Sequence, residues 1–138
     1  EDVAHSKKLV LRMHAAGPAS TAKHDVYLAG YPAVRPPHGL SAQAAALLFP
    51  GTSGGLKRVS PGQLIELVDD LPIADDKPCE RHDASTLGGS SGSPVIDFHN
   101  HRVVAIHYSG FYGDANFAVP LWLVKDDPFF GDNGVTFA

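Results

Sequence analysis

A stretch of small residues followed directly by an apolar run constrains this chain more than any other part of its sequence. Residues 86–95 read TLGGSSGSPV, with Ser91 near the centre. Glycine takes positive φ without steric cost, so Gly89 and Gly92 let the backbone turn tightly around Ser91. A serine hydroxyl needs a nearby base and stabilisation of the oxyanion to act as a nucleophile. Two readings follow: a plain turn between strands, and a loop that presents a nucleophile.

Three strands are predicted downstream of this loop. Residues 93–97 form the first, and residues 98–101 form the turn after it. The run from Arg102 to Tyr108 (RVVAIHY) is rich in β-branched residues and predicts the second strand. Residues 116–120 (NFAVP) predict a third, shorter strand.

The pattern upstream of the loop is weaker. Strands are predicted over residues 9–13, 26–30 and 63–68. Residues 41–49 (SAQAAALLF) predict a helix, because alanine and leucine have high helix propensity and Ser41 can cap its start.

The succession GSSGSPV, VVAIHYSG and NFAVP resembles the C-terminal barrel of chymotrypsin-fold serine proteases. The likeness is closest to the bacterial glutamyl endopeptidases and the related intracellular trypsin-like peptidase modules. It implies an all-β fold, an antiparallel six-stranded Greek-key barrel that is the C-terminal half of a double barrel. A short helical insertion at residues 41–49, packed against the barrel, and a short C-terminal helix from residues 121–125 would complete it. Residues 1–138 would then form a single domain without the N-terminal barrel.

The resemblance assigns the chemistry to the Ser91 loop. Ser91 takes the position of the nucleophile, and the amides of Gly89 and Ser91 take that of the oxyanion hole. In trypsin an aspartate precedes the serine and accepts a new N-terminal amine on activation. Ser90 stands there in this chain, so that activation switch is not expected. The implied substrate is a protein or peptide.

The resemblance also implies a specificity site. Thr86 and His107 match the pair that reads a P1 carboxylate in glutamyl endopeptidases, and both side chains can donate hydrogen bonds. Tyr108, Ser109 and Gly110 match the segment beside the substrate backbone. Two alternatives stay open: His107 as a satisfied barrel histidine, and Thr86 as a β-branched strand end. Related modules carry the same histidine strand without settled acidic specificity, so glutamate at P1 is a hypothesis.

In this family the histidine base and the aspartate that orients it come from the N-terminal barrel, ahead of the serine. None of the eight histidines lies in the expected sequence context. Asp2 begins an Asp-Val-Ala stretch of the expected kind, but no apolar run follows it, and an exposed terminal acid is the preferred reading. We therefore expect the catalytic His and Asp from an N-terminal barrel or a partner chain.

Composition limits the kinds of protein and of binding partner that fit this chain. The chain has 43% hydrophobic and 19% charged residues, as an ordinary globular domain does. Its net charge is −4 without a basic patch, and no apolar run reaches the ~18 residues of a membrane span, so neither nucleic acid nor membrane is an expected partner.

Cys79 is the only cysteine, so no internal disulfide can form, and we interpret it as a small buried residue. With no visible signal peptide, the bacterial cytoplasm is favoured over secretion.

No cofactor and no metal are expected. His99 and His101 have the spacing of a metal pair, and the acids between residues 69 and 76 suggest calcium, but neither group matches an established site pattern. Three hypotheses remain. The chain is half of a serine endopeptidase, a catalytically inactive protease-like module that holds a peptide by strand addition, or an unrelated β domain with a coincidental loop.

Overall fold

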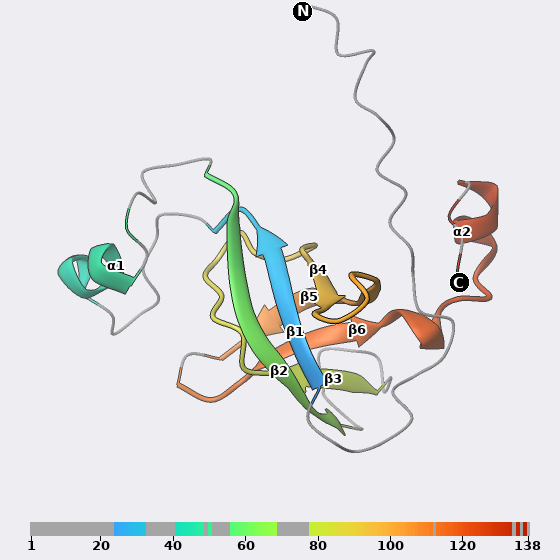
Figure 1. The fold of residues 1–138 in the computed structure, drawn as a ribbon, viewed down its shortest axis with the longest axis horizontal. Helices are drawn as coiled ribbons and strands as arrows, with labels where there is room; N and C mark the ends of the chain where they lie inside the picture. Colours follow the sequence, from blue (N-terminus) through green and yellow to red (C-terminus); the bar gives the residue numbers. More distant parts are fainter. Residues whose placement is uncertain are drawn as a thin grey trace, which may run out of the picture.

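Six antiparallel strands close into a barrel in the computed structural model (Figure 1). The structure describes residues 24–32, 41–48, 50, 56–68, 78–111, 113–133, 135 and 137. The strands are β1 (His24–Gly30), β2 (Arg58–Val68), β3 (Cys79–His82), β4 (Pro94–Asp97), β5 (Val103–Gly110) and β6 (Asn116–Pro120). Their order around the barrel is β1-β2-β3-β6-β5-β4, which confirms the predicted antiparallel six-stranded barrel.

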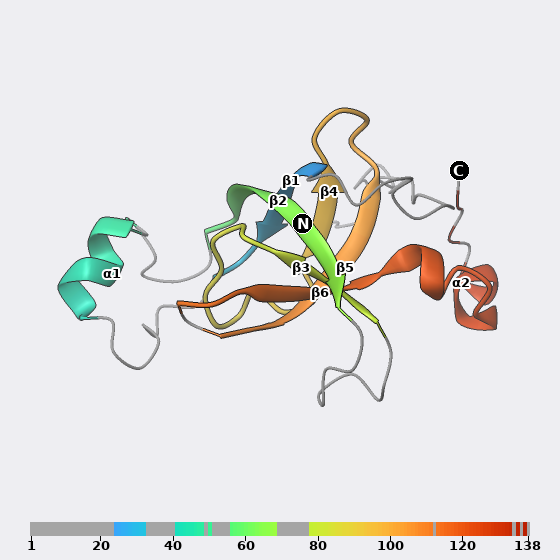
Figure 2. The same cartoon turned by 90° about the horizontal axis from the view of Figure 1, so that it is seen from below.

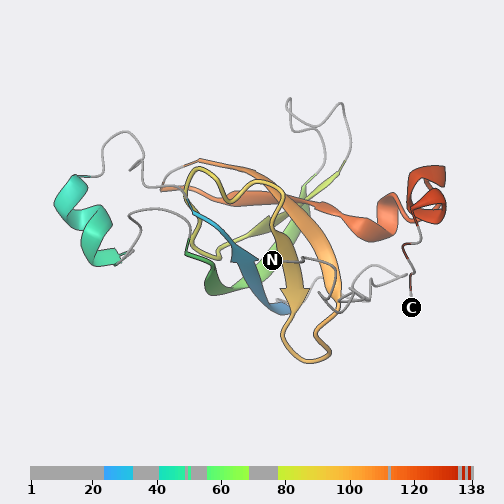
Figure 3. The ribbon, with the colours of Figure 1, turned by 90° about the horizontal axis from the view of Figure 1, so that it is seen from above.

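The connection between β3 and β4 differs from the others. β1, β2 and β3 are successive neighbours in the ring, and so are β4, β5 and β6. β3 and β4, although consecutive in sequence, stand opposite each other in the ring, so residues 83–93 must pass from one side of the barrel to the other (yellow in Figure 3). The pairing of β1 with β4 and of β3 with β6 closes the ring. The Ser91 loop is therefore the Greek-key connection.

Small and branched side chains fill the inside of the barrel. Alternate residues of a strand point to opposite faces, so Val26 and Leu28 of β1 face inward. They belong to one buried cluster with Leu64, Ala84, Val95, Ala105 and Ala118. Burial of a valine or leucine side chain contributes about 1.5–3 kcal/mol. Because Ala84 belongs to the Ser91 loop, the core itself fixes one end of that loop.

The helix α1 (Ala42–Leu48) confirms the predicted helical insertion. The side chain of Ser41 caps it, since its Oγ accepts a hydrogen bond from the Ala44 amide at 3.1 Å. The expected packing against the barrel is wrong: all three ribbon views place α1 apart from the strands, and Leu47 is 78% exposed (Figures 1, 2 and 3). Within the described residues, no helix combines the length and the apolar character needed to span a membrane.

The predicted C-terminal helix begins at Leu121 as expected, and a second helical segment follows it. Leu121–Leu123 form the 3₁₀ helix η2, which packs on β5 through the buried Leu121. The α-helix is α2 (Pro128–Asp132), at the opposite end of the molecule from α1 (Figure 2). Asp127 caps α2 by accepting a hydrogen bond from the Phe129 amide at 2.9 Å. Proline in the first turn suits this start, because its missing N–H has no helical partner there.

β2 is longer than the sequence-based expectation. β2 begins at Arg58 rather than residue 63, because its first half pairs along the whole of β1, from Gly30↔Arg58 to His24↔Leu64. Pro61 lies within this strand and is exposed, where its missing amide is tolerated. The strand expected at residues 9–13 lies outside the described residues.

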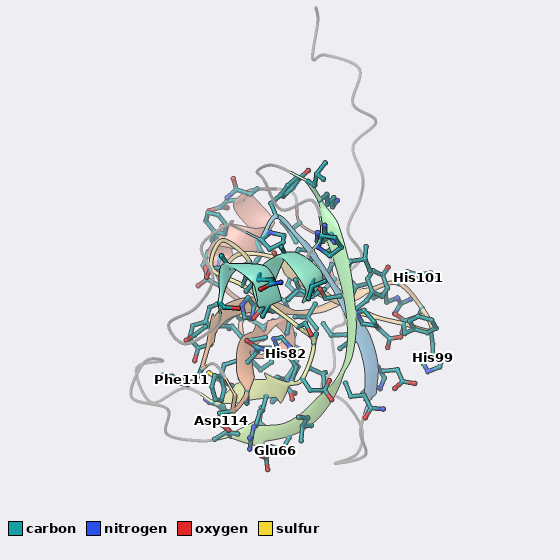
Figure 4. The ribbon with its side chains drawn as sticks, turned by 90° about the vertical axis from the view of Figure 1, so that its left-hand side faces the viewer. Glu66, His82, His99, His101, Phe111 and Asp114 are labelled. Atoms are coloured by element: carbon teal, nitrogen blue, oxygen red, sulfur yellow. The ribbon has the colours of Figure 1, made fainter. Side chains whose placement is uncertain are left out.

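β3 is a strand that was not predicted. It has four residues, Cys79–His82, and pairs with β2 on one side and with β6 on the other. On the outer face Arg81 forms ion pairs with Glu66 of β2 and with Asp114 of the β5–β6 loop, each at 2.9 Å. Glu66 and Asp114 lie close together at the lower edge of Figure 4. Pairing with neighbours distant in sequence therefore makes this segment a strand.

Candidate active site

Two turns position Ser91 at the apex of its loop. The amide of Ser90 donates to the Leu87 carbonyl and the amide of Ser93 donates to the Ser90 carbonyl, both at 3.0 Å. Gly89 and Gly92 have φ values of 90° and 85°, which confirms that these glycines adopt the left-handed region. Ser91 is exposed, whereas the neighbouring Ser90 is 2% exposed. The loop therefore directs one of two adjacent hydroxyls outward.

The loop is fastened to the end of β5. The Gly92 amide donates to the His107 carbonyl at 2.8 Å, and the His107 amide donates to the Ser93 carbonyl at 2.9 Å. The Ser91 Oγ donates to the carbonyl of Tyr108 at 3.1 Å. Tyr108 is the additional residue of a β-bulge, because His107 pairs with Ala118 while Ser109 pairs with Phe117. The bulge leaves the Tyr108 carbonyl outside the β5–β6 pairing, where Ser91 can reach it.

The two amides predicted to form an oxyanion hole flank this apex. Within the segments that the structure describes, neither the Gly89 nor the Ser91 amide has a hydrogen-bond partner. Both residues are exposed, so water can reach these N–H groups in the absence of a ligand. In the same part of the chain, no histidine side chain bonds to the Ser91 Oγ.

Thr86 is held by a residue that sequence reasoning missed. Its hydroxyl donates to the Oδ1 of Asn116 at 2.5 Å, and the Nδ2 of Asn116 donates to the Ala84 carbonyl at 3.0 Å. Asn116 begins β6 and pairs with Gly110 at the end of β5. A Cβ atom on Gly110 would collide with the Asn116 Oδ1. The absence of a side chain at Gly110 is thus what admits the carboxamide, a signal visible only once the register is known.

His107 lies inside the barrel beside a second histidine. Its Nδ1 is 3.1 Å from the Nε2 of His82, and the two residues are 3% and 0% exposed. Burial lowers the pKa of His82 to about 4, helped by the neighbouring His107 and opposed by Asp83. Burial also lowers the pKa of His107, although its hydrogen bond to the backbone of Phe117 acts in the opposite direction. Both rings are therefore neutral at pH 7.

The residues predicted for the specificity site thus have separate partners. Thr86 bonds to Asn116 and His107 bonds to His82, rather than Thr86 and His107 to each other. Tyr108 turns its hydroxyl to the Sγ of Cys79 at 3.2 Å, and burial, followed by the nearby thiol, raises the pKa of Tyr108. Cys79 is 1% exposed, which confirms it as a small buried residue.

A His–Asp contact lies at the far end of β4. The Nε2 of His24 is 2.6 Å from the Oδ2 of Asp97, and the Oδ1 of Asp97 accepts from the amides of His99 and Asn100. Burial alone would raise the pKa of Asp97, but these hydrogen bonds outweigh it and the pKa is lowered. Asp97 ends β4 whereas Ser91 precedes it, so on the order of 10 Å of strand separates them. This pair stabilises the β4–β5 turn and does not contact Ser91.

Several other predicted candidates can be placed. Figure 4 shows His99 and His101 together at one edge, on the β4–β5 turn, with His82 well inside the molecule. Across the described ranges, no group of three His, Cys, Asp or Glu side chains is arranged to hold a metal ion. Asp2, the acidic segment at 69–76 and the strand at 9–13 lie outside the described residues.

Comparison with known proteins finds a peptidase family, a curated relative and solved structures that are similar to this chain. The sequence model of a family described as "Trypsin-like peptidase domain" matches residues 10–106. A probable serine protease of Lysobacter enzymogenes is 32% identical over 71 residues, which are 50% of this chain and 18% of that protein. The active form of the Rv3671c protease from M. tuberculosis has a TM-score of 0.57 at 22% identity, over 91% of this chain and 48% of that chain. Deg5 has a TM-score of 0.55 at 16% identity, over 91% and 50%.

These structural likenesses confirm that the barrel is a chymotrypsin-like barrel. The chain spans about half the length of the solved structures and 18% of the curated relative. The glutamyl endopeptidase subtype stays a prediction.

Proposed function

Because this chain belongs to the family of trypsin-like peptidase domains, we propose that it supplies the nucleophile, the oxyanion hole and the P1 pocket of a serine endopeptidase. One observation carries the proposal. Ser91 is exposed at the apex of a loop bracketed by two glycines with positive φ, and its Oγ lies against the carbonyl of Tyr108. On this proposal residues 1–138 are one domain.

The chemistry would proceed through an acyl-enzyme at Ser91. The Ser91 Oγ attacks the carbonyl carbon of the scissile peptide bond, and its proton passes to a base. The amides of Gly89 and Ser91 stabilise the oxyanion, a contribution of about 10²–10³ in rate for each donor in related sites. The leaving amine takes the proton, and water then hydrolyses the ester. All of these steps return the serine hydroxyl unchanged.

The base must come from elsewhere. Among the described residues, the Ser91 hydroxyl donates a hydrogen bond only to a backbone carbonyl. A carbonyl of this kind is too weak a base to remove the proton. We propose that the catalytic His and Asp belong to an N-terminal protease barrel or to a partner chain. Without them the oxyanion hole and substrate binding alone would leave a small residual rate.

The proposed specificity site lies between the loop and β5. Tyr108, Ser109 and Gly110 would run beside the substrate backbone, and Thr86 and His107 would flank the P1 side chain. By the resemblance to glutamyl endopeptidases, glutamate is the favoured P1 residue. A peptide library digested by the natural protein tests this. Indifference to glutamate at P1, or an unchanged preference in His107→Ala, would remove the hypothesis.

A fluorophosphonate probe tests the catalytic role of Ser91 in the full-length natural protein that carries this chain. We expect covalent labelling that disappears in Ser91→Ala. Ser85→Ala is a matched control, since Ser85 is an exposed serine in the same loop, and it should label as the unchanged protein does. A folded full-length protein that takes no label would refute the endopeptidase.

The alternative is a catalytically inactive module that binds peptides. It is favoured by the same Ser91 hydrogen bond, because the hydroxyl is held by a carbonyl rather than by an imidazole. Such a module would hold an extended peptide against β5 by backbone hydrogen bonds. Peptide binding without fluorophosphonate labelling would identify it.

A further inference from the structure

Polar contacts around the end of β5 link the Ser91 loop, β5 and the start of β6 in one network. Ser91 bonds to the carbonyl of Tyr108, and two residues later Gly110 pairs with Asn116 across the β5–β6 ladder. Asn116 then bonds to Thr86, which lies five residues before Ser91 in the loop. The loop and the end of β5 therefore lie next to each other. Asn116 connects them, because its side chain bonds to the loop and its backbone pairs with β5.

The orientation of the Asn116 carboxamide is fixed by its partners. The Ala84 carbonyl can only accept, so the atom of Asn116 that faces it must be the nitrogen. The oxygen is then the atom that accepts from Thr86. The only hydroxyl hydrogen of Thr86 is therefore in use. The carboxamide nitrogen carries two hydrogens, and the described residues use one of them.

The neighbouring histidines do not supply a charge for an incoming side chain. Burial lowers the pKa of both His82 and His107, so neither is protonated at pH 7. The Nδ1 of His107 faces His82, and its ring also bonds to the backbone of Phe117. Of the polar side chains in this region, Asn116 retains an uncommitted hydrogen.

We infer that Asn116 is a specificity-determining residue, which donates the second hydrogen of its Nδ2 to the P1 side chain. The inference rests on the proposed function, and the ligand class is a P1 side chain that ends in an oxygen acceptor, glutamate or glutamine. Thr86 and Ala84 act as positioning groups that hold the carboxamide. Gly110 leaves the space that the carboxamide needs.

The test exchanges this one nitrogen for an oxygen. Asn116→Asp removes the donor and places a negative charge at the same point. Peptides that differ only at P1, with Glu, Gln or Lys, are compared on the full-length natural protein. We expect the ratio of kcat/KM for Glu over Lys to fall at least tenfold, since a hydrogen bond to a charged group is lost and a like charge is gained. A ratio within twofold of the unchanged protein would overturn the inference.

Two further variants separate specificity from folding. Asn116→Ala removes the donor without adding charge, so the ratios of kcat/KM for Glu over Lys and for Gln over Lys should fall about tenfold. Asn133→Asp is the matched control: it is the same substitution at the end of α2, where Asn133 also donates its Nδ2 to a carbonyl. The P1 ratio should not move in Asn133→Asp, and an equal change there would count against Asn116.

A binding measurement separates this inference from the proposed function. Calorimetry records the affinities of product-like peptides ending in Glu, Gln or Lys, with no catalysis required. If Ser91 takes no probe but Asn116→Asp reverses the order of affinities, the endopeptidase fails and the role of Asn116 stands. If Ser91 is labelled and the order stays unchanged, the endopeptidase stands and the role of Asn116 fails. Equal affinity for all three peptides also overturns it.

Discussion

The Oγ of Ser91 lies 3.1 Å from the carbonyl oxygen of Tyr108, to which it donates its hydrogen bond. That carbonyl is accessible because Tyr108 forms the bulge between His107 and Ser109 in β5. A carbonyl fixes the direction of the hydroxyl but cannot remove its proton. In this arrangement the barrel determines where the hydroxyl lies, and its reactivity depends on a base supplied from outside the described residues.

Gly92 tests the backbone conformation of the loop. Its φ is 85° and nothing lies within 4 Å of the position its Cβ would occupy. Gly92→Ala should therefore act through the backbone alone, lowering the free energy of unfolding by about 1–2 kcal/mol. Urea denaturation measures this change, and Ser91 labelling should fall with it.

Gly88 is the matched control within the same loop. Its Cβ position is equally open, and its φ lies outside the left-handed region. Gly88→Ala should leave the free energy of unfolding unchanged or raise it by about 0.4–1 kcal/mol, because alanine restricts the unfolded chain. Equal losses in Gly88→Ala and Gly92→Ala would contradict the explanation by φ.

Gly62 tests the contact between β2 and the start of the loop. A Cβ on Gly62 would lie 2.5 to 2.7 Å from the backbone and Cβ of Ala84. Because backbone atoms cannot rotate away, Gly62→Ala should lower the free energy of unfolding by about 1–3 kcal/mol. It should also reduce turnover of Glu peptides, since the Ala84 carbonyl holds Asn116.

Gly131→Ala serves as the comparison for Gly62. Gly131 lies in α2 with nothing within 4 Å of its Cβ position, so alanine should be neutral or stabilising there. Thermal unfolding of both variants gives the result. A Gly62→Ala protein as stable as Gly131→Ala would show that Ala84 moves more freely than these contacts imply.

The burial of His82 predicts that the folded protein loses stability in acid. Its pKa falls from 6.5 to about 4 on folding, because the ring is fully buried. The unfolded chain therefore binds the proton first, so the contribution of His82 is complete above pH 6.5 and is lost as the pH falls toward 4. The shift corresponds to about 3 kcal/mol. Unfolding free energies measured by urea at intervals from pH 4 to 7.5 would show this slope.

His82→Gln isolates that contribution. Glutamine does not titrate, and its amide can still donate toward the Nδ1 of His107. The stability of this variant should depend less on pH between 6.5 and 4, with the remaining slope due in part to His107, whose pKa is lowered in the same direction. An unchanged slope in His82→Gln would show that His82 is accessible to protons in the folded protein.

Local signals explain which parts the sequence predicted. β6 at residues 116–120 has the predicted bounds, and β5 at 103–110 lies within two residues of them, because β-branched residues bounded by turns are visible in any short window. The tight turn at Gly89 and Gly92 was predicted because only glycine takes positive φ freely. These features depend on residues next to one another in the chain.

Register explains what the sequence did not predict. β3 has no β-branched residue, and it is a strand because β2 and β6 pair with it. The contact of Asn116 with Thr86 joins residues 30 positions apart in the chain, and that of His82 with His107 joins residues 25 positions apart. No short window contains that information.

Ser91 lies in the only covalent link between two three-stranded meanders, β1 to β3 and β4 to β6. Its loop is held by both meanders, because Ala84 belongs to the shared core while Gly92 is tied to β5. A molecule with one meander misplaced would have no correctly formed serine site. Reaction of Ser91 with a probe would therefore require an assembled barrel in addition to the base.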